Sequence, residues 1–289
     1  MVAAPARRLA TFRLLTGAFA LAYLLARFPY FLDLADLPAS RWDPPLPLAW
    51  LGAPPGRAAV VVVLLAAVGV GAAYLVGWRF RVSGPAFAAL LLAVMSYRNG
   101  WGHVFHTDNL LVLHVGIVGL SPAADAWALG APDIEPEDEV RYGWPLRLAA
   151  VVTVLTYVVT GVAKLRYAGG DWLSGDTLLN QIAFDNARKK VLGDTYSPLA
   201  GALAGHPWLF RPMGLLTLVV ELGAPVALLG RRWAAASAAA AWTFHLGIVA
   251  LMWISFLYPL SLIAFAPFFR CERVVTALAG SPPVRRLVS

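Results

Sequence analysis

The stretch LAAVVTVLTYVVTGVAK, residues 148–164, decides the class of fold. Its residues before the final lysine are uncharged and mostly apolar, and a helix of this length approaches the thickness of the hydrocarbon core of a bilayer. The run ends at Lys164. A lysine there either snorkels to the lipid headgroups at little cost or faces other helices, where its charge is expensive. The direction of Lys164 therefore bears directly on function.

The composition is that of a membrane protein. Hydrophobic residues make up 60% of the chain and charged residues 13%, and the mean hydropathy is +0.69. A soluble domain carries about 25% charged residues, so this chain cannot cover a water-facing surface. The net charge of +7 comes from basic residues in short loops and termini, where they set topology, so no nucleic-acid partner is expected. The one cysteine, Cys271, excludes an intrachain disulfide and a cysteine-based metal site.

The apolar runs predict an all-α integral membrane protein, a bundle of about eight transmembrane helices. The expected spans are residues 12–32, 58–77, 84–97, 107–121, 146–165, 212–230, 233–254 and 255–270. Three of them are short, which is tolerable for segments packed inside a bundle. We interpret residues 1–289 as a single membrane domain, with residues 271–289 as a short cytoplasmic tail.

Basic clusters predict the orientation in the cell membrane. Arginines occur at the N-terminus, in the turns at 78–81 and 230–232, and after residue 269, all on one side of the expected bundle. By the positive-inside rule this side is cytoplasmic, so both termini are expected in the cytoplasm. The run 188–190 falls on the other side, in a long loop where charge counts weigh less. The apolar stretch after Arg13 shows no cleavage site and is interpreted as a retained signal anchor.

The long outer loop, residues 166–211, is expected to contain an amphipathic helix on the membrane surface. Residues 170–175 indicate a turn, and Asp176 is the expected helix N-cap. The side chains expected to face the membrane are Leu178, Leu179, Ile182 and Phe184, and those expected to face water are Arg188, Lys189 and Lys190.

Polar residues inside the spans mark the candidate site. On a helix, Tyr157, Thr160, Gly161 and Lys164 fall along one stripe, which predicts a hydrogen-bonded line that faces the interior and leads to a small cavity. Glu221 and His245 lie at similar depths in their spans. A carboxylate there is costly alone, so we expect Glu221 to pair with His245 or with another inward polar group. A purely structural pair stays open.

A second polar cluster, YRNGWGHVFHTDN at residues 97–109, joins two spans on the outer side. It contains Trp101, His103 and His106, and His114 follows on the next helix. The HxxH spacing is one found in metal sites, but no carboxylate shares that face, and no metal is expected. The alternatives are histidines that bond loop backbone and a catalytic or ligand-binding histidine, in the first place His106.

Several segments resemble a known family. HTDNLL (106–111), YVVTGVAKL (157–165), DWLSGDTL (171–178) and WTFHLGIVALMWISFLYPLSLIAFAPFF (242–269) are similar to the horizontally transferred transmembrane domain. This domain is the membrane part of vitamin K-dependent gamma-carboxylase and of bacterial relatives, and the resemblance spans roughly residues 7–270. It implies that Lys164 is the base that deprotonates vitamin K hydroquinone, assisted by His106 or His103. It also implies that His245 matches a histidine of the family.

The expected function is that of a membrane enzyme acting on reduced vitamin K, another quinol or another lipid-soluble substrate. Its base would be Lys164, with His106 donating to the oxyanion. Substrate contacts are expected from Tyr157, Trp101, His103, Glu221 and His245. Carboxylation of glutamate is the weaker expectation, because the luminal domain and disulfide of the carboxylase have no counterpart in this sequence.

The expected partners are a membrane lipid or quinone, with a peptide or protein substrate as a further option. Two non-enzymatic classes stay open. One is a membrane protein that aids maturation or export of a peptide. The other is a small transporter, in which Glu221 and His245 relay protons.

Overall fold

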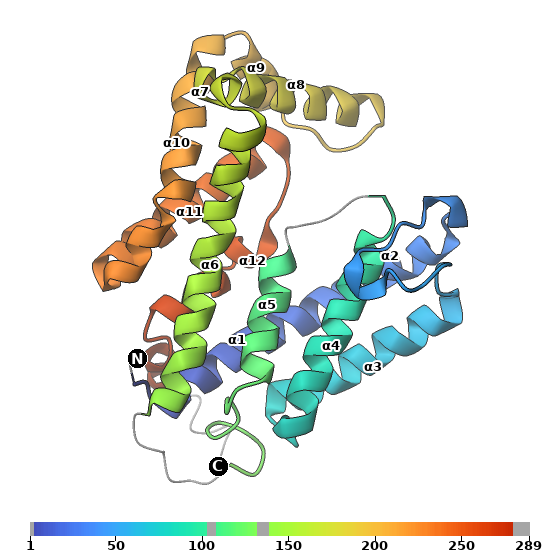
Figure 1. The fold of residues 1–289 in the computed structure, drawn as a ribbon, viewed down its shortest axis with the longest axis vertical. Coiled ribbons are helices and arrows are strands. Elements are labelled where there is room, and N and C mark those ends of the chain that lie inside the picture. The colour runs from blue at the N-terminus through green and yellow to red at the C-terminus, as the bar shows by residue number, and fades with distance from the viewer. Residues whose placement is uncertain (1–2, 103–107, 132–138, 280–289) are drawn as a thin grey trace. The chain divides into compact units, whose positions relative to one another are not determined.

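The computed structural model describes residues 3–102, 108–131 and 139–279, and Figure 1 shows their fold. In this part of the chain the regular elements are helices, and the one β-type contact is an isolated bridge between Ala4 and Glu139. Six of the described helical segments are long and apolar enough to cross a membrane. They are α1 (Ala6–Ala26), α3 (Arg57–Val76), α4 (Phe80–Asn99), α6 (Val140–Tyr167), Pro207–Leu229 around α10, and α11 (Arg231–Met252). The prediction of an all-α, multi-pass membrane protein is therefore confirmed.

The expected number of eight spans is not confirmed. The span expected at 107–121 contains α5 (Asn109–Gly119), an apolar helix of only 11 residues. Residues 255–270 form no continuous helix but the short α12 (Leu257–Leu260) and the 3₁₀-helix η7 (Ile263–Phe268). Pro259 and Pro267 lack the backbone N–H that a long helix needs, and Leu262 adopts a left-handed φ of 65° between the two elements. A hydropathy count does not register these breaks.

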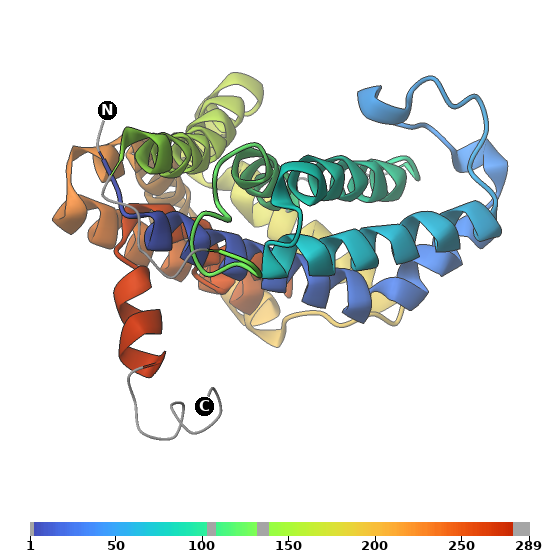
Figure 2. The ribbon, with the colours of Figure 1, turned by 90° about the horizontal axis from the view of Figure 1, so that it is seen from below.

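The described helices fall into two compact units, which are treated separately here. The first contains residues 1–149 and 269–289, with α1, α3, α4 and α5 packed together. Figure 2 shows α1 and α3 running along one another. The unit also holds α2 (Phe28–Asp33), the 3₁₀-turns η1 (Leu34–Asp36), η2 (Ala39–Arg41) and η3 (Leu46–Leu48), and α13 (Glu272–Ala279).

Three contacts explain the packing of this first unit. A Cβ added to Gly119 would lie 2.6 Å from the carbonyl oxygen of Gly84, so the backbones of α4 and α5 touch. The fully buried Arg13 of α1 donates to the carbonyl oxygens of Ala123, at 2.8 Å, and of Trp127. The Arg8 guanidinium donates two bonds to the Glu272 carboxylate, which ties α13 to α1.

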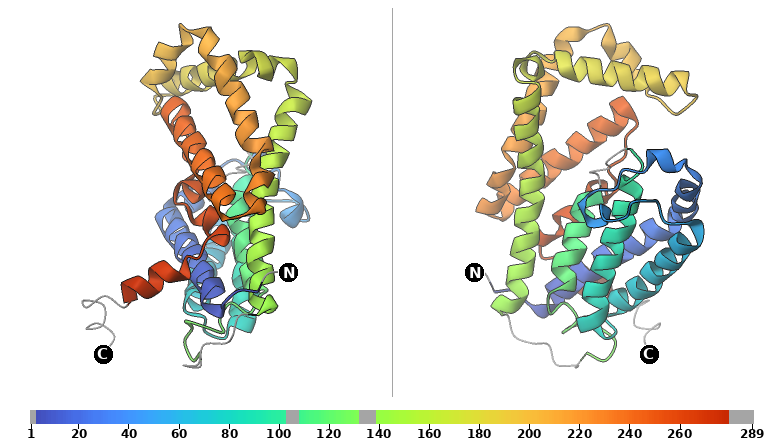
Figure 3. Two further views of the ribbon diagram at one scale, coloured as in Figure 1. Left: turned by 90° about the vertical axis from the view of Figure 1, so that its left-hand side faces the viewer. Right: turned by 45° about the vertical axis from the view of Figure 1, so that its right-hand side comes forward.

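The second unit contains residues 150–268, all of them described. It holds the later part of α6, α7 (Gly170–Ser174), α8 (Asp176–Val191), α9 (Pro198–Ala204), η5 (Pro207–Leu209), α10 (Phe210–Leu222), η6 (Ala224–Leu229), α11, α12 and η7. Figure 3 shows α6, α10 and α11 as its three long elements, with α8 crossing near their ends. Helices α6, α10 and α11 carry most of the residues of the candidate site.

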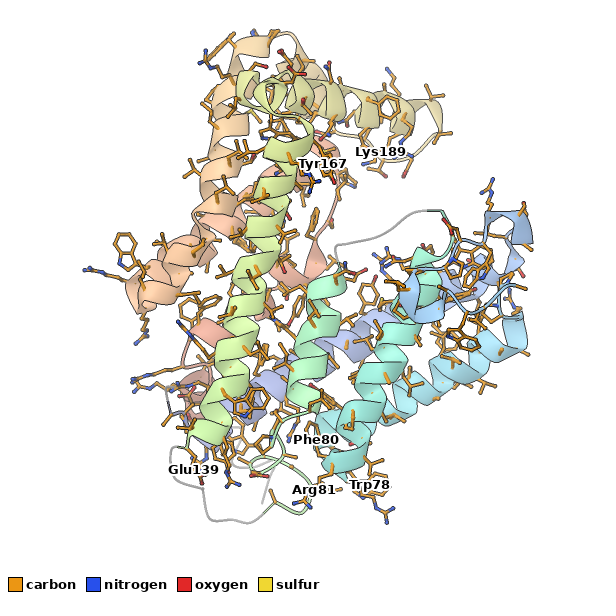
Figure 4. All side chains as sticks on the ribbon, viewed as in Figure 1. Trp78, Phe80, Arg81, Glu139, Tyr167 and Lys189 are labelled. Carbon is orange, nitrogen blue, oxygen red and sulfur yellow. The ribbon has the colours of Figure 1, made fainter. Side chains whose placement is uncertain are left out.

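Helix α8 is the amphipathic helix expected in the 166–211 loop, but its N-cap and four of its side chains are placed differently. The N-cap is Gly175 and not Asp176, which is the first residue of the helix. Leu178, Leu179 and Ile182 were expected to face the membrane and instead pack into a cluster with residues of α9, α10 and α11. Phe184, from the same expected face, is 70% exposed. Lys189, labelled in Figure 4, was expected to face water and is instead buried.

The burial of Lys189 has a clear physical reason. The last carbonyls of α11 have no partner within their own helix, and α8 with the following turn supplies donors to three of them. Ser197 Oγ donates to Ala250 at 2.5 Å, Asn186 Nδ2 donates to Leu251 at 2.8 Å, and Lys189 Nζ donates to Met252. A cation at this end also complements the helix dipole. Whether α8 lies on a membrane surface stays a prediction.

Candidate functional site

The inward stripe on α6 is the frame of the site. Tyr157 and Gly161 are buried, and the side chain of Lys164 is 16% exposed. Their spacing of four and three residues puts them on one face of the helix. Thr160, the fourth residue expected in the stripe, donates its hydroxyl to the carbonyl oxygen of Thr156 in the same helix. Because its side chain is only 16% exposed, Lys164 points into the second unit instead of along its surface.

The partner of Lys164 is Glu221 on α10. Lys164 Nζ lies 2.5 Å from Glu221 Oε1, and the Glu221 side chain is 2% exposed. Gly161 permits this approach of α6 to α10, because a Cβ there would lie 2.8 Å from Leu222 Cδ2 and 3.1 Å from Glu221 Cβ. The prediction that Glu221 pairs with an inward polar group matches this arrangement, with lysine rather than His245 as the partner.

Two aromatic rings complete the surroundings of the ammonium group. Lys164 Nζ is 4.6 Å from the ring centroid of Trp172 and 5.3 Å from that of Phe244, within the range of cation–π attraction. Neither ring was singled out from the sequence. The tryptophan of DWLSG is evident in the sequence, but its contact with Lys164 depends on how α7 packs against α10 and could not be predicted from the sequence.

The DWLSG turn places Trp172 by backbone geometry. Trp172 Nε1 donates to Gly214 O at 3.2 Å and to Thr217 Oγ1 at 3.1 Å, both on α10. Gly175, the next residue after α7, has a φ of 91°, and a Cβ there would lie 2.5 Å from the carbonyl carbon of Phe210. Only glycine fits this combination of left-handed backbone and close approach. The turn thus fixes the tryptophan ring over Lys164.

A second polar pair lies two helical turns before Lys164. Tyr157 Oη and His245 Nε2 of α11 are 2.9 Å apart and share a hydrogen bond. The His245 ring is buried and has the rings of Phe244 at 5.3 Å and Phe256 at 4.8 Å between centroids. Phe244 therefore contacts both Lys164 and His245, and the two polar pairs belong to one cluster.

A small cavity adjoins this cluster, as the stripe on α6 predicted. Its volume is about 20 Å³, enough for about one water molecule. Tyr157 and Phe265 form part of its wall, and most of the rest is made of small or aliphatic side chains: Thr153, Val154, Val220, Ala224, Ala227, Ala234, Ser237, Ala238 and Ala241, with Phe268. The surroundings of Tyr157 are thus apolar on this side.

The outer cluster of the sequence is only partly described. His103 and His106 lie outside the described residues. Trp101 belongs to the first unit, where its ring packs against those of Trp42 at 5.1 Å and Tyr97 at 5.9 Å. Its role in binding substrate with Lys164 stays a prediction, as do the roles of the two histidines.

The first unit holds a further buried polar group that was not singled out from the sequence. Arg98, in the last turn of α4, forms an ion pair with Asp108 and donates to Tyr23 Oη at 2.9 Å, while Tyr23 Oη donates to Asp108 Oδ2 at 2.8 Å. Arg98 lies next to the end of the span expected at residues 84–97, and this position could have indicated a buried ion pair from the sequence. Its partners come from α1 and from the start of α5, which no local pattern indicates.

Residues 3–102, 108–131 and 139–279 contain no group of three or more histidine, cysteine, aspartate or glutamate side chains placed to hold a metal ion. Searches with family models, among curated proteins and among solved structures find no match for the chain. The resemblance to the transmembrane domain of the carboxylase therefore stays a prediction, and the function rests on the geometry of the site.

Proposed function

We propose that the protein is a multi-pass membrane enzyme that takes a proton from a reduced quinone, with the Lys164–Glu221 pair as the base. The observation that carries the proposal is the direction of Lys164. It lies near the end of a membrane-span helix, yet it turns inward to the buried carboxylate of Glu221, and its ammonium lies near the rings of Trp172 and Phe244. A lysine kept only for membrane topology would gain more from the headgroups and water at the helix end.

The proton balance of the pair suits this role. The pair is neutral overall, either as ammonium and carboxylate or as amine and carboxylic acid. When the O–H bond of a quinol breaks, its proton joins the pair and its electron pair stays on the quinol oxygen. In either case the pair becomes ammonium plus carboxylic acid with one net positive charge. That charge appears beside the new oxyanion, where a low dielectric strengthens the attraction.

A quinol is the substrate class that fits the surroundings. The resemblance implies reduced vitamin K or a related quinol, and the rings of Trp172, Phe244 and Phe256 offer aromatic surfaces to a flat ring. Such a substrate reaches the site from the bilayer. Molecular oxygen, which would oxidise the quinolate, is small and soluble in membranes. We retain His106 as a further donor to the oxyanion.

The eight-crossing topology, with both termini cytoplasmic and Lys164 at the outer end of α6, is part of the proposal. It requires α5 and residues 255–270 to return the chain across the membrane. Helix α5 rises about 16 Å against a hydrocarbon core of about 30 Å. Short or irregular crossings are tolerated where protein buries them. Leu111, Val115, Ala264 and Phe265 are buried, which supports such crossings.

The test is oxygen-dependent oxidation of a quinol by the purified protein in lipid nanodiscs. Vitamin K hydroquinone is the substrate, and quinone and epoxide are measured by chromatography. Lys164→Ala is expected to abolish turnover, because the remaining Glu221 has lost the ammonium that stabilises the product oxyanion. Lys190→Ala, at an exposed lysine of α8, is the matched control and keeps full activity. Equal turnover of Lys164→Ala and the control would overturn the proposal.

A further inference from the structure

Three buried polar side-chain atoms in the second unit have no hydrogen-bond partner among the described protein groups. One, Asp185 Oδ2, lies 2.7 Å from the ammonium of Lys189 in an ion pair. The other two are Glu221 Oε2 and His245 Nδ1, the far atoms of the two polar pairs. Glu221 Oε1 is bonded to Lys164, and His245 Nε2 is bonded to Tyr157. A buried polar atom without a partner costs about 1–3 kcal/mol. Two such atoms in one cluster indicate a place where something polar is bound.

The hydrogen bond between Tyr157 and His245 decides which ring nitrogen carries the proton. If His245 Nε2–H donates to Tyr157 Oη, the tyrosine proton has no acceptor among the described groups and Nδ1 is a bare acceptor. Each of the two side chains then has one group without a hydrogen-bond partner. If Tyr157 Oη–H donates to Nε2, the one group left without a partner is the Nδ1–H donor. The second arrangement leaves fewer unsatisfied groups and is the favoured one.

We propose that Tyr157 is a positioning residue that holds His245 in its Nδ1–H form, and that this N–H donates to an oxygen of the bound substrate. Glu221 Oε2 is the complementary acceptor for a substrate hydroxyl. The inference rests on the proposed function and assigns a second contact to the same site. Its ligand is an aromatic ring that bears at least one hydroxyl group and a second oxygen. A hydroquinone has this pattern.

The access route follows from burial. Both atoms have almost no exposed surface, so a ligand reaches them only when a neighbouring side chain turns aside. Phe256 is the side chain placed for this. Its ring lies against that of His245, and residues 253–256 between α11 and α12 are not helical. Trp253, where the helix ends, has a left-handed φ of 53°. In this proposal, rotation of Phe256 uncovers the His245 ring without unwinding α11.

The tautomer is measured directly by ¹⁵N NMR of histidine-labelled protein in nanodiscs. The chain has five histidines, and the His245 signals are identified by their loss in His245→Gln. The expected result is a protonated Nδ1 and a bare Nε2, which changes to a mixed population in Tyr157→Phe. Tyr142→Phe removes another buried tyrosine hydroxyl from α6, bonded to Asp125 at 2.9 Å, and leaves the His245 signals unchanged. A bare Nδ1 in the unaltered protein overturns the inference.

The donor role is tested with 2-methyl-1,4-naphthohydroquinone under anaerobic conditions. Titration is expected to shift the His245 Nδ1 signal, and an unchanged signal at saturation overturns the contact. In turnover assays, Tyr157→Phe lowers kcat about 10- to 100-fold with KM within about twofold, as for other positioning residues. Turnover equal to that of Tyr142→Phe would remove the donor role and leave the lysine base intact. If instead the quinol shifts the His245 signal but is never oxidised, the proposed function fails and the binding inference stands.

Discussion

The buried pair of Lys164 and Glu221 predicts a specific pattern of stability changes. Removing one partner leaves the other charge uncompensated, which costs about 3–5 kcal/mol for a buried pair. The lower half of that range applies, because the Lys164 side chain keeps 16% exposure. Lys164→Met also loses the attraction to Trp172 and Phe244, about 1 kcal/mol. We therefore expect about 4–5 kcal/mol for Lys164→Met and about 3–4 kcal/mol for Glu221→Gln.

The double variant is the informative one. Once Lys164 is gone, loss of the Glu221 charge removes an uncompensated carboxylate rather than a stabilising partner. Lys164→Met/Glu221→Gln should therefore be no less stable than Lys164→Met alone, which gives a coupling energy of at least about 3 kcal/mol, the whole cost of Glu221→Gln. The assay is unfolding in mixed micelles with increasing dodecyl sulfate, followed by circular dichroism and by the fluorescence of the tryptophans.

A matched control comes from an exposed ion pair with nearly the same separation. Arg57 Nη1 lies 2.6 Å from Asp36 Oδ2, but the two side chains are 50% and 65% exposed. The same cycle with Arg57→Met and Asp36→Asn is expected to give a coupling of about 0–1 kcal/mol. If the Lys164–Glu221 cycle gives a coupling as small as this control, the inward pairing is wrong, and with it the base that the proposed function requires.

Two further predictions concern the helices around the site. Gly161→Val is expected to destabilise the protein by about 1–3 kcal/mol and to lower quinol turnover, because its side chain forces α6 away from Glu221 and Leu222. Gly247→Val on α11, where a Cβ meets nothing within 4 Å, is the control, and equal losses would refute the close approach. Lys189→Met is expected to lower the free energy of unfolding by about 1–2 kcal/mol through loss of its bond to Met252 and of its ion pair with Asp185. Lys190→Met, at an exposed position, should change it by less than about 0.5 kcal/mol, and a cost as large as that of Lys189→Met would contradict the cap.

The sequence predicts faces of helices better than it predicts partners. A helical spacing shows that Tyr157, Gly161 and Lys164 share a face, and the polar character of that face predicts an inward direction. The helix that meets this face is set by long-range packing. Glu221 and His245 were therefore expected as inward polar residues, but which of them meets Lys164 and which meets Tyr157 is visible only in the fold.

The misplaced side chains of α8 and the missing continuous helix at residues 255–270 have local causes of a different kind. An amphipathic pattern assigns lysines to water, whereas Lys189 finds stronger acceptors in the last carbonyls of α11. A hydropathy sum counts apolar residues and ignores that Pro259 and Pro267 cannot donate to a helix ladder. In both segments the hydrogen bonding of the backbone, and not the preference of side chains for lipid or water, decides the local structure.

Stability and activity measured together distinguish a structural pair from a catalytic one at Lys164. A buried ion pair is often replaced by apolar residues at little or no cost in stability, so a purely structural pair has a harmless substitute. A base has none, because methionine and leucine cannot take a proton. Lys164→Met/Glu221→Leu should therefore fold with nearly unaltered stability and still be inactive toward the quinol. A stable and active double variant would show that the charges serve only packing, and the search for the base would then move to the outer histidines.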